Sequence, residues 1–353
     1  MADDPMRHAR RWMRRAVEDG AIPGGAIHVL HRGRTVWREA FGTTDGTRPA
    51  TCATRYDLAS LTKPLATAST LFALTARGDL LLSQPIGDLL PDVPECWKRV
   101  EVSRLLDHTS GLPPWIPCHA AGPGLDAAVS AVLATPPAAA PGEAYAYSCL
   151  GYILLARIVE VVAGKPLDRV ARKRVFAPRG LDSLGFKPGP ATDVAPTTSR
   201  EGPEGDGPTA LHGVVHDGNA RSIEAGGVSV SGNAGLFGTV DDVAKFGEQL
   251  RAGGGPRRGR WSTAIRDGYL RARSTPAGHT RALFARPNPL VSAGDWFGDD
   301  VVGHSGYTGT ALVIDPRTET TVALCTNAVL WEGKGDWLLV RRRVMTAIAA
   351  GLP

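Results

Sequence analysis

The N-terminal pattern of apolar and polar positions predicts a helix followed by a β-hairpin. Residues 5–19 place apolar side chains at helical spacing on one stripe and arginines on the opposite face. The apolar stripe consists of Met6, Ala9, Trp12, Met13, Ala16 and Val17. After a glycine-containing break, residues 26–30 and 35–41 are strand-like and flank a short turn at 31–34. The first forty residues therefore predict one helix and two antiparallel strands.

A second pair of strand-like segments lies near the C-terminus. Residues 310–314 and 321–326 are rich in apolar and β-branched side chains, and an Asp-Pro-Arg turn at 315–317 separates them. Residues 335–350 then predict a closing helix. Because strands occur at both ends of the chain, we predict a single sheet built from the two termini.

The residues between these strand regions are mainly helical in pattern. Apolar positions recur at helical spacing in segments 63–77, 103–107, 125–133, 151–163 and 167–175. Connections rich in proline and glycine separate these segments, at 112–117, 135–142 and 187–208. The connection at 187–208 is long and polar, so we predict a surface loop or a domain boundary there.

Composition is that of an ordinary globular protein. The chain has 353 residues, of which 43% are hydrophobic and 21% are charged. No stretch approaches the roughly 20 apolar residues that span a bilayer, so no membrane span is expected. The N-terminal residues lack the apolar core of a secretory signal, which predicts a cytoplasmic location. The 5 cysteines are widely spaced without a Cys-x-x-Cys, so neither a disulfide framework nor a zinc knuckle is predicted.

Positive charge is scattered along the chain in short arginine runs. The formal charge is +5, and arginines cluster within residues 10–15, 257–260 and 341–343. The first and last runs lie in predicted helices, where we expect the arginines to form a solvated face. A nucleic-acid-binding protein would combine such runs with stacking aromatics or a known module. Neither accompanies these runs, so we expect no nucleic-acid partner.

Ser60 and Lys63 form a Ser-x-x-Lys motif at the start of an apolar helical segment. Residues three apart on a helix share a face, so the amine can reach the hydroxyl. Pro64 is compatible only with the first helical turn, so Ser60 is expected at a helix N-terminus. The helix N-terminus favours negative charge and disfavours a protonated amine. Serine needs such a neighbour because its hydroxyl alone is a weak nucleophile. Taken alone, the pair also fits two solvated side chains on a helix.

Two further segments carry candidate chemistry. Tyr147 precedes the predicted helix 151–163, so we expect it on the loop that leads into this helix. A phenol beside an ammonium is driven toward phenolate and can then act as a base. Residues 303–309 hold three glycines and His304 before a predicted strand, which indicates close approach of the backbone to a ligand. Taken alone, Tyr147 also fits a half-buried packing residue and His304 a surface histidine.

A dinucleotide fingerprint, a P-loop, His-Glu-x-x-His and Gly-x-Ser-x-Gly are all absent from the sequence.

These motifs, in this order, resemble the penicillin-recognising serine hydrolase superfamily, and within it the class C β-lactamase and esterase branch. Supporting segments extend over nearly the whole chain, at 56–64, 105–112, 145–152, 234–239, 303–310 and 314–316. The resemblance implies a mixed α/β (α+β) fold, with an antiparallel sheet flanked by helices and a second, mainly helical lobe. We expect residues 1–75 and 215–353 to form the sheet domain and residues 76–214 the helical lobe, with the active site between them.

The resemblance assigns catalytic roles to three residues. Ser60 is similar to the nucleophile that becomes acylated in the family. Lys63 resembles the group that accepts the serine proton. Tyr147 resembles the phenol that shares this work and protonates the leaving group. His108, in the segment 105–112, is expected to have a structural role.

The resemblance also implies a substrate pocket. His304, Ser305 and Gly306 are similar to the third family motif, which lines the acyl pocket. The backbone N–H groups of Ser60 and Tyr307 would form the oxyanion hole. Paired donors of this kind typically contribute a few kcal/mol to lowering the barrier. No metal or cofactor is expected at this site.

The chain departs from the family pattern at two places. Cys149 stands where relatives have Asn or Asp, and Gly232-Asn233 stands where relatives often have Gly-His. A thiol is a poor donor and a weak acceptor, so Cys149 should leave Lys63 short of a polar partner and ease the loss of its proton. The same change should weaken recognition of amide-type carbonyl groups. Alternatively, Cys149 is a small buried hydrophobe.

We therefore expect a metal-free serine hydrolase that forms an acyl-enzyme at Ser60 on a small-molecule ester, amide or β-lactam. Cys149 and the lack of an export signal favour carboxylic ester hydrolysis or acyl transfer. β-Lactamase or D,D-carboxypeptidase activity is the first alternative. A non-catalytic protein that binds acyl groups or β-lactams on the same fold is the second.

Overall fold

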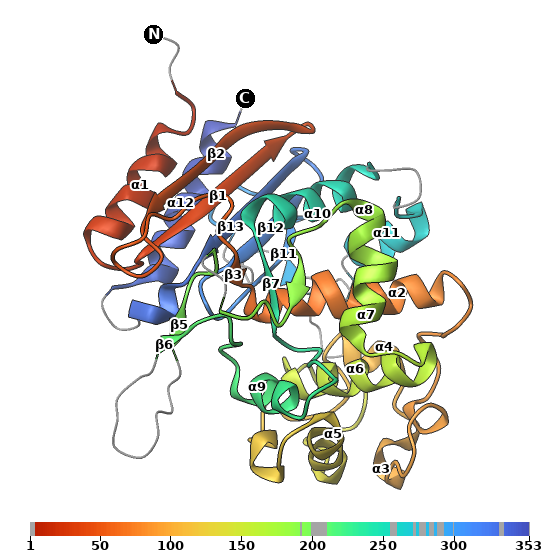
Figure 1. Cartoon of the computed structure of the whole chain (residues 1–353). Helices are drawn as coiled ribbons and strands as arrows, with labels where there is room; N and C mark the ends of the chain where they lie inside the picture. Colours follow the sequence, from red (N-terminus) through yellow and green to blue (C-terminus); the bar gives the residue numbers. More distant parts are fainter. Residues whose placement is uncertain are drawn as a thin grey trace.

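The strands from both chain ends form one antiparallel sheet in the computed structural model, which describes residues 4–190, 193–198, 210–254, 260–270, 273–274, 280–281, 286–287, 293–298, 300–331 and 335–352 (Figure 1). Its order is β10-β11-β12-β13-β1-β2, and every neighbouring pair is antiparallel. The strands are β1 (Gly24–His31), β2 (Arg34–Gly42), β10 (Arg286–Pro287), β11 (Val302–Ser305), β12 (Ala311–Asp315) and β13 (Thr320–Thr326). Because β1 pairs directly with β13, the prediction of one sheet from the two termini is confirmed.

The β1–β2 hairpin turns where the sequence predicted. Its two turn residues are Arg32 at φ +51° and Gly33 at φ +77°. Two consecutive residues with positive φ match the right-handed twist of the flanking strands, and the glycine adopts this conformation without steric cost.

Helices cover both faces of the main sheet (Figure 1). α1 (Arg7–Glu18) and α12 (Trp337–Gly351) pack on one face, and α10 (Val240–Ala252) packs on the other. Successive side chains of a strand point to opposite faces. Ile27 accordingly joins the cluster of apolar residues under α1 and α12, whereas Ala26 joins the cluster on the other face.

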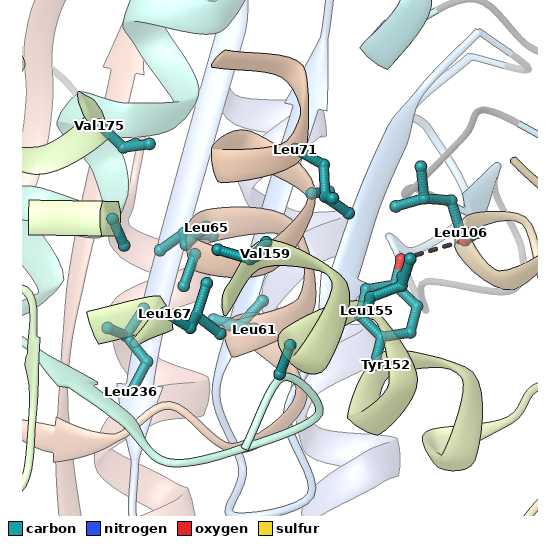
Figure 2. Packing of buried hydrophobic residues seen from close by; sticks show 14 of the residues in the cluster. Leu61, Leu65, Leu71, Leu106, Tyr152, Leu155, Val159, Leu167, Val175 and Leu236 are labelled. Atoms are coloured by element: carbon teal, nitrogen blue, oxygen red, sulfur yellow. Dashed lines mark hydrogen bonds between the residues drawn. The ribbon is translucent and has the colours of Figure 1, made fainter. Parts of the chain in front are cut away.

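A second, mostly helical region surrounds the apolar helical run that follows Ser60 (Figure 2). The remaining described helices are α2 (Ser69–Thr75), α3 (Glu95–Lys98), α4 (Val102–Leu106), α5 (Leu125–Ala134), α6 (Cys149–Ala163), α7 (Leu167–Ala171), α8 (Ala177–Arg179), α9 (Gly218–Ala225) and α11 (Thr263–Leu270). Leu61 and Leu65 pack among Val159 of α6 and Leu167 of α7 in this cluster. The buried Tyr152 hydroxyl donates to the Leu106 carbonyl at 3.0 Å, which ties α6 to α4.

Short strands and turns complete the architecture. The short strands are β3 (Tyr56–Asp57), β4 (Gly185–Phe186), β5 (Thr197–Thr198), β6 (Ala210–Leu211), β7 (Leu236–Gly238), β8 (Arg273–Ser274) and β9 (Thr280–Arg281). The 3-10 turns are Ala59–Leu61, Ile86–Asp88, Cys118–Ala121 and Ala328–Trp331, and the π-helical turns are Lys63–Ala68 and Arg172–Phe176. β3 pairs with β7, so the strand just before Ser60 is held by a distant part of the chain.

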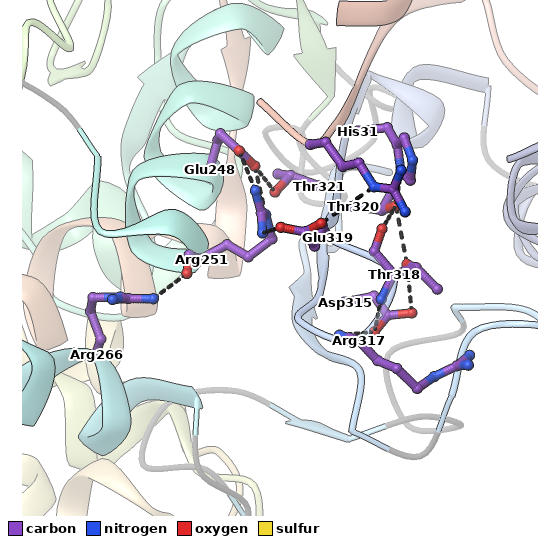
Figure 3. A network of polar contacts seen from close by, with 11 residues as sticks. His31, Glu248, Arg251, Arg266, Asp315, Arg317, Thr318, Glu319, Thr320 and Thr321 are labelled. Atoms are coloured by element: carbon purple, nitrogen blue, oxygen red, sulfur yellow. Dashed lines mark hydrogen bonds and ion pairs between the residues drawn. The ribbon is translucent and has the colours of Figure 1, made fainter. Parts of the chain in front are cut away.

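A polar network fastens α10 to the hairpin between β12 and β13 (Figure 3). Arg251 lies 2.6 Å from Glu248 and 3.6 Å from Glu319. Glu248 also accepts a hydrogen bond from Thr321 of β13 at 2.9 Å. Since Arg251 and Glu248 are largely buried, this network contributes more than an exposed ion pair would.

The structure corrects the prediction for one arginine run, and parts of another arginine run and of the connection at 187–208 lie outside the described residues. Arg342 and Arg343 are exposed as predicted, but Arg341 is buried with 4% of its surface exposed, so the prediction of a solvated arginine face is wrong there. Arg257 and Arg258 lie outside the described residues, as do 191–192 and 199–208 of the connection predicted at 187–208. No helix among the described residues is long and apolar enough to cross a membrane.

Candidate active site

A tightly held turn presents Ser60. Buried Asp57 accepts hydrogen bonds from the backbone N–H of Ala59 at 2.8 Å and of His216 at 2.7 Å. Ala59 has a φ of +46°, a left-handed conformation that is unfavourable for alanine. Burial raises the pKa of Asp57 to about 6, while the two N–H groups oppose this shift. Asp57 therefore holds the residue before Ser60 in a strained conformation.

The turn after β11 packs directly against the Ser60 turn. Thr308 donates to the carbonyl of Asp57 at 2.7 Å, and Thr310 donates to the carbonyl of Leu58 at 3.1 Å. A Cβ atom on Gly306 would lie 2.5 Å from the Leu58 carbonyl oxygen, so only glycine fits at this approach. The two segments predicted to carry chemistry thus meet backbone to backbone.

Lys63 is fully buried and contacts Ser60. Its Nζ donates to Ser60 Oγ at 3.1 Å and to the Asn233 carbonyl at 3.1 Å, and it lies 3.5 Å from Cys149 Sγ. Burial lowers the pKa of Lys63, but the nearby Cys149 thiol and Tyr147 phenol raise it, and the net shift is upward. The expectation that Lys63 loses its proton more easily is therefore wrong, because Cys149 is itself a polar neighbour of the amine.

Tyr147 stands beside this amine on the segment that leads into α6. The Lys63 Nζ lies 5.0 Å from the centre of the Tyr147 ring. The ring also packs against His108 at 4.5 Å and His304 at 5.8 Å between ring centres. The segment is fixed at its end by Ser148, whose side chain accepts from the Leu150 N–H and caps α6.

His108 supports the Tyr147 segment from behind. Its Nδ1 accepts a hydrogen bond from the Ser148 N–H at 3.0 Å, and its carbonyl accepts from the Ala146 N–H at 3.0 Å. The residue itself has a φ of +62°, which is uncommon for a non-glycine residue. The sequence predicts His108 in a turn but not against Tyr147, because the two residues lie 39 positions apart in the chain.

His304 and Ser305 end strand β11, and Gly306 and Tyr307 form the turn toward β12. The sequence pattern predicts this motif before a strand, whereas its first residues, up to Ser305, themselves belong to strand β11. The Tyr307 ring is half exposed and stacks on His216, with 5.5 Å between ring centres and 15° between planes. This stack connects the turn after β11 to the loop that Asp57 holds.

Two cavities open on Ser60. The larger, about 830 Å³, is lined by Ser60 and Tyr147, by the segment 304–307, and by residues at the start of α12. The smaller, about 380 Å³, is lined by Ser60, Tyr147 and Tyr307 together with Cys149 and Trp115. All the residues predicted to form the site are therefore brought together around the Ser60 hydroxyl, and Lys63 reaches it through its hydrogen bond.

Among the described residues, no group of three or more His, Cys, Asp or Glu side chains could hold a metal ion. Lys63 Nζ contacts the Ser60 hydroxyl, the Cys149 thiol and the Asn233 backbone carbonyl, so one buried amine joins these three groups. Such an arrangement can accept and return a proton while the hydroxyl attacks an electrophilic carbon.

Comparison with known proteins gives a consistent result. The family described as Beta-lactamase matches residues 9–344. A putative D-alanyl-D-alanine carboxypeptidase of Escherichia coli strain K12 is 31% identical, over 90% of this chain and 81% of that protein. Among solved structures, EstCE1, titled a hydrolase with promiscuous acyltransferase activity, has a TM-score of 0.77 at 22% identity, covering 98% of each chain. Simvastatin synthase of Aspergillus terreus has a TM-score of 0.72 at 19% identity, covering 99% of this chain and 98% of that one.

Proposed function

Because the chain belongs to the β-lactamase family of serine hydrolases, we propose that it forms an acyl-enzyme at Ser60 and hydrolyses or transfers the acyl group of small carboxylic esters. The contact of 3.1 Å between Lys63 Nζ and Ser60 Oγ carries this proposal. A fully buried amine beside a hydroxyl at the start of a helical run suits proton transfer from the serine.

The proposed reaction uses the pair of Lys63 and Tyr147 as one base. Ser60 Oγ attacks the acyl carbonyl carbon while the pair takes the hydroxyl proton. The tetrahedral oxyanion is stabilised by the N–H groups of Ser60 and Tyr307. Tyr147 returns the proton to the leaving oxygen as the bond to the leaving group breaks. Water or a second alcohol then attacks the ester on Ser60, and the same pair accepts its proton.

The two cavities suit the two halves of an acyl-transfer substrate. Each contains Ser60 and Tyr147, and they extend away from the hydroxyl in different directions, toward α12 and toward Trp115. His304, Ser305 and Gly306 line the larger cavity. The proposal keeps the division into a sheet domain, residues 1–75 and 215–353, and a helical lobe, residues 76–214, with Ser60 between them.

Cys149 favours ester substrates within this proposal. Its sulfur lies 3.5 Å from Lys63 Nζ and lines the smaller cavity, where an amide side chain would supply a strong donor to a substrate carbonyl. A thiol supplies only a weak donor. An activated ester needs less of that help than a peptide or a β-lactam. The resemblance to a putative D-alanyl-D-alanine carboxypeptidase keeps peptidase or β-lactamase activity as the alternative.

Turnover of a p-nitrophenyl ester tests the proposal. We expect many p-nitrophenol molecules per chain, and release that stops near one per chain would instead identify an acyl-binding protein. Intact mass after incubation with a fluorophosphonate, followed by peptide mapping, should place the adduct on Ser60. The same measurement with a penicillin reports whether β-lactams acylate this serine. An adduct on Ser305 or on a cysteine would overturn the proposal.

A further inference from the structure

The two helices at the ends of the chain enclose a groove of unbalanced charge. α1 and α12 pack against each other on the face of the main sheet opposite α10 (Figure 1). A groove of about 760 Å³ lies between them. Among the described residues that line it, four arginines accompany two aspartates: Arg7, Arg11, Arg342, Arg343, Asp4 and Asp295. Asp4 already contacts Arg10, and Asp295 lies 3.5 Å from Arg342, so the groove is positively charged.

Three arginines gather around one indole ring at this groove. The guanidinium of Arg343 lies 4.5 Å from the centre of the Trp12 ring, and those of Arg11 and Arg15 lie 5.8 Å and 5.7 Å from it. Arg15 has a carboxylate partner, Asp19, at 3.3 Å. Within the described part of the chain, neither Arg11 nor Arg343 forms an ion pair. Like charges held this close repel one another, so an anion that joins them is bound favourably.

Large apolar side chains are exposed at the edge of the same groove. Leu339 lines the groove and is 42% exposed, and its neighbour Leu338 is 60% exposed. Trp296 is 66% exposed and follows Asp295, whose N–H donates to Thr346 of α12 at 3.1 Å. Exposed leucine and tryptophan side chains beside arginines are typical of proteins that bind to a bilayer surface. The apolar side chains enter the headgroup region, and the arginines contact anionic lipids.

We propose that this α1–α12 face, defined by the groove and by Trp296, Leu338 and Leu339, docks on an anionic phospholipid surface. A guanidinium presents paired N–H donors that match the oxygens of a phosphate, so Arg11 and Arg343 suit lipid headgroups. A nucleic acid or another soluble polyanion would use the arginines but would gain nothing from the exposed leucines. The combination of charge and apolar surface therefore favours a lipid partner, independently of the chemistry at Ser60.

Docking on this face also positions the larger cavity that opens on Ser60. Leu338 lines that cavity, whereas Leu339, the next residue of α12, lines the groove. The docking face and the cavity thus adjoin at the start of α12, and a docked protein holds this cavity beside the bilayer.

Sedimentation with vesicles tests the proposal. The protein is mixed with vesicles of phosphatidylcholine alone, or of phosphatidylcholine with about 30% phosphatidylglycerol, in about 0.1 M NaCl. The wild type should bind the anionic vesicles at least about tenfold more tightly, and about 0.5 M NaCl should remove most of this gain by screening. Equal binding to both vesicles, or binding to neither, would overturn the proposal. Ser60→Ala should bind as the wild type does, so a failure of the proposed hydrolase activity leaves this test unchanged.

A double arginine variant locates the binding face. Arg11→Gln with Arg343→Gln should weaken binding to the anionic vesicles by about 25-fold, because each arginine near such a surface contributes about fivefold. The matched control is Arg99→Gln with Arg172→Gln, which removes two exposed arginines next to α3 and α7, far from this face (Figure 1). The control should stay within about twofold of the wild type, because charges beyond a Debye length are screened. An equal loss in the control would show that net charge alone directs binding, and would refute the assignment of the face.

A conservative variant separates charge from packing against Trp12. Arg11→Lys with Arg343→Lys keeps both charges, and it should bind anionic vesicles within about fivefold of the wild type. Both double variants should keep the Tm of the wild type, since the two side chains are exposed. If the lysine variant loses binding as fully as the glutamine variant, charge does not drive the docking and the proposal fails.

Replacing the exposed apolar side chains distinguishes a bilayer from a soluble polyanion. Trp296→Asn with Leu339→Asn should weaken binding to anionic vesicles by about tenfold or more, because two apolar side chains no longer enter the headgroup region. The same variant should bind heparin, a polyanion without a bilayer, as the wild type does. Unchanged vesicle binding by this variant would reject a bilayer partner. Complete displacement of the wild type from vesicles by duplex DNA at an equal charge concentration would indicate a nucleic acid instead, and would also overturn the proposal.

Discussion

Replacing Cys149 with asparagine tests whether this one side chain selects esters over amides. Cys149 is the first residue of α6, and its backbone N–H donates to the Pro114 carbonyl at 3.0 Å, so the position of its Cα is fixed independently of the side chain. The side chain lines the smaller cavity and is partly exposed. An asparagine can therefore be accommodated without displacing the helix.

The expected magnitude follows from the partners of Lys63. Its amine contacts two oxygens, Ser60 Oγ and the Asn233 carbonyl, at 3.1 Å each, and one sulfur, Cys149 Sγ, at 3.5 Å. Exchanging the weak sulfur acceptor for an amide oxygen strengthens one contact to a charged donor, and the amide N–H₂ becomes available to a substrate carbonyl. Restoring one such interaction is worth about 1.4 kcal/mol, or roughly tenfold.

The assay compares kcat/KM for a p-nitrophenyl ester with kcat/KM for a chromogenic β-lactam. The ratio of β-lactam to ester should rise by roughly tenfold in Cys149→Asn, because only the amide-type substrate needs the new donor.

Two controls separate specificity from packing. Cys149→Ala removes the sulfur without adding a donor, and it should leave the ratio of β-lactam to ester unchanged. If Cys149 is only a packing residue, Cys149→Asn should lower the Tm and reduce both activities in parallel. A parallel fall with a reduced Tm would refute the specificity argument.

The remaining predictions concern the nucleophile, its base and the carboxylate beneath it. Ser60→Ala should abolish labelling by a fluorophosphonate in intact-mass analysis while leaving the Tm nearly unchanged; persistent labelling would reject the assignment. Lys63→Ala should reduce kcat by at least about 100-fold and Tyr147→Phe by a comparable or somewhat smaller factor; a greater loss in His108→Ala than in both would point to a different base. Burial raises the pKa of Asp57 to about 6, so its folded-state pKa exceeds the value of the unfolded chain. Its contribution to stability is therefore greatest below about pH 4 and is lost as the pH rises toward 6. The Tm of the wild type relative to Asp57→Asn should fall across that interval, and a pH-independent difference would contradict the shift.

The fold could be predicted from the sequence where the signal is local. The helical stripe of α1, the β1–β2 hairpin and the β12–β13 hairpin all follow from side-chain periodicity and turn residues that lie within a few positions of one another. Strand β11 was missed because it spans only Val302–Ser305, includes a glycine, and is defined by its pairing with β12. A strand this short has too few positions for alternation to be recognised.

The candidate site shows the same division between local and long-range information. The Ser60–Lys63 contact could be predicted, because residues three apart in a helical run lie on one face. The placement of His108 behind Tyr147 and of the Asn233 carbonyl on Lys63 could not, because each joins segments far apart in the chain.

Arg341 shows most clearly what only the tertiary structure decided. From the sequence by itself, an arginine beside two other arginines on a helix is expected in solvent, because burying a charge is costly. Residues 342 and 343 follow that rule, whereas the rotation of α12 against the sheet directs Arg341 inward to the cavity that opens on Ser60. Periodicity determined that this segment is a helix; the packing of α12 against its neighbours determined which arginine is buried beside the candidate active site.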